Sequence, residues 1–226
     1  MKVRQLLKAK LNNSGAALVT VIVVIAFVSV LVTVMLYMAG VNYYMKSADK
    51  EVKDSFYKAE TAMENIRAGL MIEAKNAYQS ACQTTMAEFL AMTPSIRQQT
   101  YYKNFTDSIT SIFNTHITAN GGTPDGLEIY LQNLSGYGTN LTTTAAGVEV
   151  HEDDGYVVIR DVNISYTLDN YLSIITTDFV IKAPEADWGT DSSLDAWVPG
   201  EDPAEVLTRE EISMADCVIY MNWKKE

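Results

Sequence analysis

The sequence predicts an α+β fold in which one long N-terminal helix runs from a membrane into an exterior domain and packs there on a small antiparallel β-sheet. Three patterns lead to this prediction: an apolar run at residues 16–41, apolar residues at helical spacing from Val52 to Ala81, and alternating apolar and polar residues between Tyr156 and Ala183. A spacing of three to four residues marks one face of a helix, and strict alternation marks a half-buried strand.

The apolar run follows a short basic leader. Residues 1–15 contain four basic side chains and no acidic one, and the next charged residue after Lys10 is Lys46. As a helix that rises about 1.5 Å per residue, residues 16–41 exceed the roughly 30 Å hydrocarbon core of a bilayer. The run is also longer than the ~7–15 apolar residues of a cleaved secretory signal. The positive-inside bias then places the leader in the cytoplasm and residues 46–226 outside.

The apolar run continues into an amphipathic stretch, residues 42–93. From 42 to 91 the chain has no proline, and its only glycine is Gly69. One apolar stripe consists of Val52, Phe56, Ala59, Met63, Ile66, Leu70, Ala74, Ala77 and Ala81. The stripe drifts from strict heptads and is rich in alanine beyond Ile72, which favours close packing on a sheet over a coiled coil. We therefore expect one continuous helix that is stopped by Pro94.

Residues 94–226, with the outer part of the long helix, are enough for one exterior α+β domain with its own core. Ser95 and Gln98 have the spacing of a capping box, and apolar residues after them predict a second helix that ends near Asn114. Residues 127–146 are ambiguous, and their glycines and threonine run indicate mostly irregular structure.

The strand pattern is strongest between Tyr156 and Ala183. Two sets of residues are each expected on one face of a strand: Val162, Ile164, Tyr166 and Leu168, and then Ile175, Thr177, Phe179 and Ile181. Asp169-Asn170 is predicted as the two-residue turn between the strands, because both residues tolerate left-handed backbone angles. The adjacent pair Ile174-Ile175 predicts a bulge.

An acidic connector, residues 185–211, precedes a last predicted strand from Asp216 to Trp223. Three aspartates in the connector raise the question of weak calcium binding: Asp187, Asp191 and Asp195. They lack the Asp-x-Asp-x-Asp-Gly spacing that gathers ligands around one cation, so a solvated loop is the favoured interpretation.

Composition argues against several classes of function. Outside the leader the chain carries 13 basic and 28 acidic side chains, a net charge of −15 against −11 for the whole chain. Such a surface repels nucleic acid and anionic lipid, so no nucleic-acid partner is expected. The only histidines, His116 and His151, fall in expected loops, and no serine-hydrolase, zinc-protease or P-loop motif occurs. We therefore predict a protein that is not an enzyme and that has neither a cofactor nor a metal site.

The two cysteines, Cys82 and Cys217, both lie in the predicted exterior portion. Two buried thiols are the favoured interpretation. One disulfide between them is the alternative, because the exterior of a cell can sustain disulfides.

Short sequence features near the two ends of the chain carry a family resemblance. The leader ends in Gly15, and Leu18 and Val19 fall where the prepilin motif places a leucine and an aliphatic residue. The stretch 56–62 resembles an Ala-Glu-x-Ala segment of the same family, and Asn222-Trp223-Lys224 resembles its tail. The chain thus resembles a type IV prepilin, in particular the PilX-type minor pilins in forms seen in Gram-positive bacteria. The resemblance covers the N-terminal third well and the remainder in architecture and tail.

The resemblance implies a pilin-like fold and a structural role. A prepilin peptidase would cut between Gly15 and Ala16, and the apolar helix would then pack among the helices of other pilin subunits. The pilus assembly machinery would place the processed subunit in a cell-surface filament of a type IV pilus or a related secretion system. The expected function is therefore that of a minor pilin or pseudopilin.

Two positions depart from the family pattern. Mature pilins usually begin with Phe or Met, where this chain has Ala16, and usually carry Glu at position five, where it has Thr20. In major pilins that carboxylate pairs with the N-terminal amine of a neighbour, and unpaired it would be costly in hydrocarbon. Thr20 therefore fits a tip or initiating subunit. The alternative is a single-pass membrane-anchored exterior binding protein, in which Thr20 only bonds to its own helix backbone.

Overall fold

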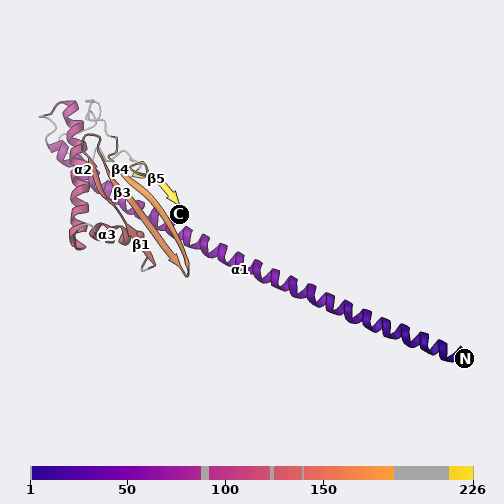
Figure 1. The fold of residues 1–226 in the computed structure, drawn as a ribbon. Coiled ribbons are helices and arrows are strands. Elements are labelled where there is room, and N and C mark those ends of the chain that lie inside the picture. Colours follow the sequence, from indigo (N-terminus) through magenta and orange to yellow (C-terminus); the bar gives the residue numbers. More distant parts are fainter. Residues whose placement is uncertain (1, 88–91, 123–124, 139, 186–213, 226) are drawn as a thin grey trace. The chain divides into compact units, whose positions relative to one another are not determined.

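The computed structural model describes residues 2–87, 92–122, 125–138, 140–185 and 214–225. It divides the chain into two compact units, residues 1–51 and 52–226. Most of the predicted acidic connector, with Asp187, Asp191 and Asp195, lies outside the described residues. The described elements confirm the predicted α+β class, with a long N-terminal helix and an antiparallel sheet (Figure 1).

The first element is a single helix, α1, from Lys2 to Ala87. It carries both the apolar run and the amphipathic stretch, so the prediction of one continuous helix is confirmed, and the helix also includes the basic leader. In the second unit the stripe is buried against the sheet: Ala59, Ile66, Leu70, Ala74, Ala77 and Ala81 are each 0% exposed. The stripe begins later than predicted, because Val52 is 42% exposed.

Two further helices cover the same core. The helix α2 runs from Pro94 to Ala119, past the predicted end at Asn114. The predicted capping box at Ser95 and Gln98 is wrong: Thr93 occupies the N-cap position without a side-chain hydrogen bond, and Pro94 begins the helix. Proline suits a first helical position, because its fixed φ fits the helix and its missing N–H has no partner there.

The prediction of irregular structure at residues 127–146 is wrong. This region contains helix α3, Asp125–Ser135, and strand β1, Leu141–Thr144, and it is followed by strand β2, Gly147–His151. The helix α3 is short but amphipathic, and Leu127, Tyr130 and Leu131 are buried in the core. Asp125 and Glu128 lie in its first turn, where negative charge favours a helix N-terminus.

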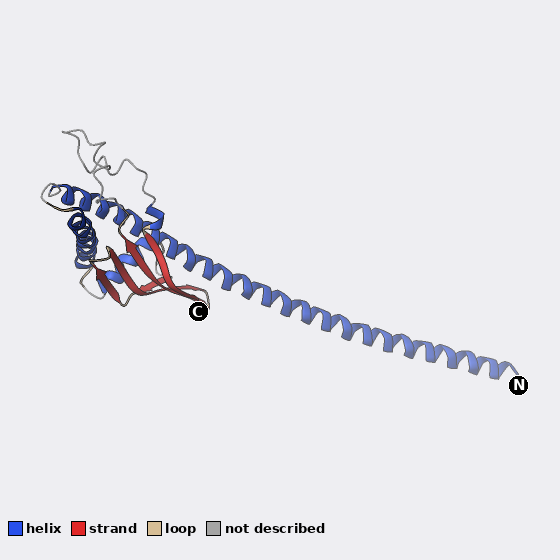
Figure 2. Ribbon diagram, turned by 90° about the horizontal axis from the view of Figure 1, so that it is seen from above, coloured by secondary structure: helices blue, strands red, loops and turns tan. Residues whose placement is uncertain are grey.

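The sheet is antiparallel throughout, with the order β1-β3-β4-β5 and with β2 also paired to β3. The long strands are β3, Tyr156–Leu168, and β4, Tyr171–Lys182. The predicted turn at Asp169-Asn170 is confirmed: Leu168 pairs with Tyr171, and Asp169 has φ 52°. Figure 2 shows the strands side by side, with the outer half of α1 along the sheet.

The last strand, β5, runs from Val218 to Lys225 and pairs with β4, after a short 3₁₀ helix η3 at Met214–Asp216. It therefore starts and ends two residues later than predicted. The residues expected on one face of each long strand do face the core: Val162, Ile164, Ile175, Thr177, Phe179 and Ile181 are 0% exposed.

The predicted bulge at Ile174-Ile175 is wrong, because β3 and β4 stay in register from Val162 and Thr177 to the turn. The register instead shifts between Ile159 and Val162, and in the β4–β5 pair between Thr176 and Asp178. Asp161 and Asn222 have φ 50° and 55°, the left-handed conformation found where strands are interrupted. The two adjacent isoleucines simply face opposite sides, since Ile174 is half-buried and Ile175 fully buried.

Candidate processing and assembly site

The predicted cleavage position lies inside α1. The helix is unbroken through Gly15 and Ala16, and Gly15 is exposed. A Cβ atom added to Gly15 would meet nothing within 4 Å. A glycine inside a helix costs about 0.5–1 kcal/mol relative to alanine. Nothing in the described chain requires glycine here, so a requirement for it would come from a molecule that acts on the chain.

The apolar half of α1 has no partner within the described residues that covers it. It is the one described helix long and apolar enough to cross a membrane by length and composition. Large side chains along it are exposed, from Leu18 at 63% to Leu36 at 69%. Water is an unfavourable environment for such a surface, at roughly 25 cal/mol per Å² of apolar area. Residues 17–45 are therefore a candidate membrane span.

Aromatic and hydroxyl side chains on this half of the helix agree with such an environment. Tyr37, Tyr43 and Tyr44 are 74–77% exposed near the end of the run, where aromatic residues gather at a membrane–water interface. The Ser29 hydroxyl donates to the Ile25 carbonyl and the Thr33 hydroxyl to the Ser29 carbonyl, both at 2.8 Å. These bonds satisfy the two hydroxyls within the helix itself. Thr20 is exposed on the same helix.

A buried carboxylate joins three strands of the second unit. The Asp178 carboxylate accepts hydrogen bonds from the Asp161 backbone N–H and the Asn222 amide, both at 2.7 Å. The Arg160 guanidinium lies 3.3 Å away and also pairs with Glu149. Burial acts to raise the pKa of Asp178, but these partners outweigh it, so the pKa lies below its ordinary value.

Asp178 explains both register shifts. Its two closest partners, Asp161 and Asn222, are the two residues with positive φ in β3 and β5, and Asp178 lies on the strand between them. Sequence analysis missed this cluster. The one signal for it was an acidic residue inside the β4 pattern, between Thr177 and Phe179.

The two cysteines are buried thiols that form no disulfide with each other, the interpretation favoured from the sequence. Burial raises the pKa of Cys82 to about 12, against a small opposing effect of a hydrogen bond with Tyr78, and burial also raises the pKa of Cys217. Burial raises the pKa of Tyr101, and the charges of the two thiols when ionised act in the same direction. The Tyr101 hydroxyl donates a hydrogen bond to the Pro184 carbonyl at 2.9 Å. Thiols with raised pKa values are weak nucleophiles at neutral pH.

The placement of both histidines in loops is wrong. His116 lies in α2, stacks on Tyr130 with ring centroids 4.4 Å apart, and has its Nε2 3.7 Å from Glu73. His151 ends β2 and stacks on Tyr156. Among the described residues, no group of three His, Cys, Asp or Glu side chains is arranged to hold a metal ion.

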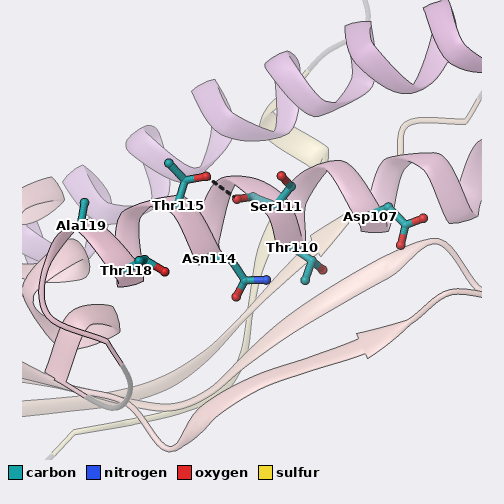
Figure 3. A pocket seen from close by; sticks show the side chains of 7 residues that line it. All are labelled: Asp107, Thr110, Ser111, Asn114, Thr115, Thr118 and Ala119. Atoms are coloured by element: carbon teal, nitrogen blue, oxygen red, sulfur yellow. Dashed lines mark hydrogen bonds between the residues drawn. The ribbon is translucent and has the colours of Figure 1, made fainter.

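Two hollows border α2. One is an open trough of about 710 Å³ along the helix, lined by hydroxyl and amide side chains such as Thr110, Asn114 and Thr118, with Asp107 at one end (Figure 3). The other is a more enclosed cavity of about 280 Å³ that also includes Thr110 and Asn114 but lies against β2. Sequence analysis missed both, since they depend on how α2 packs on the strands.

Comparisons with models of protein families, with curated proteins and with solved structures found no match. The long N-terminal helix packed on an antiparallel sheet is compatible with a pilin-like fold.

Proposed function

We propose that the protein is a PilX-type minor pilin or pseudopilin, a non-enzymatic structural subunit of a type IV pilus or a related secretion filament. The observation that carries the proposal is that the two halves of one unbroken helix have different environments. Residues 17–45 of α1 are exposed and apolar, whereas residues 59–82 form part of the core of an exterior α+β unit. Such a helix can be stored in a membrane and later exchange lipid contacts for contacts with other helices.

The basic leader supports an order of events. Before processing, residues 1–15 stay in the cytoplasm and the apolar run spans the membrane. A prepilin peptidase removes the leader after Gly15, which has no side chain and where an added Cβ would meet no atom from outside the surrounding turns of the helix. The processed helix then packs among the helices of other subunits, while the exterior unit decorates or caps the filament. Thr20 in place of an acid supports a tip or initiating position.

Processing provides the decisive experiment, with a matched control in the same helix. The chain is co-expressed with a prepilin peptidase, and intact and N-terminal masses are measured. We expect a product that begins at Ala16 from the natural chain and an uncut product from Gly15→Val. Gly40→Val should be cut normally, because Gly40 is also a glycine of α1 with nothing within 4 Å of an added Cβ.

Retention of the leader in the natural chain would contradict the proposal. A product that still begins at Met1 would instead support the alternative, a single-pass membrane-anchored exterior binding protein that never assembles.

A further inference from the structure

Strand β2 is an edge strand of the described sheet. β2 pairs with β3, and within the described ranges no further strand lies beside it. In an antiparallel pair, alternate residues direct their backbone N–H and C=O groups away from the partner strand. Such an edge can pair with an additional extended chain.

The helix α2 runs beside this edge and forms a groove with it. We define the α2–β2 groove as the cavity lined by four residues of α2, by Leu127 of α3 and by five residues in and before β2: Thr110, Phe113, Asn114, Ile117, Leu127, Ala145, Ala146, Gly147, Val148 and Val150. Its apolar lining includes Phe113, Val148 and Val150, and none of the residues that line it is charged. The volume of about 280 Å³ is just below the ~300–1,000 Å³ of sites for drug-sized ligands, so it suits a single apolar side chain.

Two polar residues of α2, Thr110 and Asn114, also line the groove. The Thr110 Oγ1 atom is buried and has no hydrogen-bond partner among the described residues. Asn114 is exposed and borders both the groove and the open trough (Figure 3). A hydroxyl and an amide in these positions can bond to the backbone or to small polar side chains of a chain that lies along the groove.

The rim of the groove is acidic. β2 leads directly into the exposed residues Glu152-Asp153-Asp154, and the exposed Asp107 lies in the adjoining trough. The Lys103 ammonium pairs with both Asp107 and Glu152, so a single positive charge lies beside two carboxylates. Charge complementarity therefore favours a ligand with basic residues on either side of its apolar residue.

We propose that the α2–β2 groove binds an extended peptide segment of another polypeptide, which adds as a strand to the edge of β2, inserts one apolar side chain between α2 and β2, and carries flanking basic residues. Strand addition supplies affinity through backbone hydrogen bonds, and the pocket supplies selectivity through the inserted side chain. This proposal does not depend on cleavage at Gly15 or on filament assembly.

The test uses the full chain in detergent micelles and fluorescent hexapeptide mixtures as probes. Each mixture has lysine at both ends, Val, Thr and Tyr at the variable positions, and either Leu or Asp fixed at position three. A third mixture repeats the Leu series with alternate backbone nitrogens methylated. By fluorescence anisotropy we expect the Leu mixture to bind at least tenfold more tightly than the other two, and more weakly at high salt.

Two variants locate the site. Val150→Asp, which places a charge in the groove, and Asn114→Trp, which fills it from the helix side, should each weaken binding of the Leu mixture at least tenfold. The matched controls are Thr142→Asp on strand β1 and Gln99→Trp near the start of α2, which change exposed residues outside both hollows. Each control should bind the Leu mixture with an affinity within twofold of that of the natural chain.

Several outcomes would overturn the proposal. Binding of the Leu mixture that is undetectable, or equal to that of the Asp mixture, would exclude the apolar pocket as the determinant. Equal binding of the methylated mixture would exclude strand addition. Self-association of the chain that Val150→Asp abolishes would show that a second copy occupies the groove instead.

Discussion

At the scale of single residues, Asp178 connects local backbone geometry to the stability of the sheet. One carboxylate bonds to groups of β3 and β5 at the two points where those strands depart from regular register. Hydrogen bonds to a charged acceptor stabilise more than those between neutral groups. Without this carboxylate, the Asp161 N–H and the Asn222 amide would each lose a partner in a part-buried environment.

We predict that Asp178→Asn lowers the free energy of unfolding of the second unit by about 1–3 kcal/mol at pH 7. Because the pKa of Asp178 is lowered in the folded state, its stabilising effect is present above about pH 4, the ordinary value for an unfolded chain, and is lost as pH falls through the folded value. Urea titrations monitored by tryptophan fluorescence between pH 3 and pH 7 should show the natural chain and the variant converging in acid.

The exposed Asp153 provides the control, since Asp153→Asn removes a carboxylate that is not enclosed by the sheet. A difference between the natural chain and Asp178→Asn that stayed constant down to pH 3 would contradict an ionised, stabilising carboxylate.

At the scale of elements, the outer half of α1 packs into the core through only one of its faces. Ile66 and Leu70 are 0% exposed against the sheet, whereas Ile72 on another face of the same helix is 62% exposed. Phe56 is only partly buried, and its ring lies under the Lys225 ammonium at 3.6 Å from the centroid. Packing therefore strengthens along the helix from Phe56 toward Ile66 and Leu70.

We predict that Ile66→Ala destabilises the second unit by about 2–5 kcal/mol, whereas Ile72→Ala changes its stability by no more than about 0.5 kcal/mol. The two substitutions have the same chemistry and the same effect on helix propensity, so the difference between them measures packing alone. Thermal unfolding of the full chain in detergent, followed by circular dichroism, gives the comparison. Equal losses at both positions would mean that the helix is covered on more than one face.

At the scale of the whole molecule, the chain divides into two units, residues 1–51 and 52–226. Among the described residues, every member of the hydrophobic core belongs to the second unit: the core is assembled from α1 from Ala59 onward, from α2 and α3, and from the sheet. The second unit thus has its own source of stability. The exposed apolar surface of the first unit would gain stability from a membrane or from other helices, and its contacts are where an assembly role can be tested.

We predict that Thr20→Glu weakens membrane retention or assembly. If this subunit starts or caps a filament, no partner amine neutralises the new carboxylate, which costs on the order of 2.5–3.5 kcal/mol near a helix centre in a bilayer and less near the interface. Thr20→Val, similar in size and uncharged, should behave like the natural chain. Filaments are counted by electron microscopy in strains that carry each variant. More or longer filaments with this subunit along the shaft of the Thr20→Glu strain would refute the tip position.

The continuous helix, its apolar and amphipathic halves, the two long strands and the Asp169-Asn170 turn were determined by the sequence alone. Each depends on a local pattern: the spacing of apolar side chains along one element, or the backbone preference of two adjacent residues. Gly15 and Thr20 were singled out from the sequence by the resemblance to the prepilin motif, and the roles proposed for them depend on their positions along one helix.

Other features were decided only by the tertiary structure. Helix α3 and strand β1 are too short to be predicted from the spacing of their apolar residues. They are stable because α3 packs on α2 and β1 pairs with β3. The bulges lie at Asp161 and Asn222, not at Ile174-Ile175, because a carboxylate from a third position, Asp178, satisfies their polar groups. The α2–β2 groove likewise joins residues of α2 with residues in and before β2 that lie 28 to 40 positions further along the chain, and only the packing of a helix beside a sheet edge brings them together.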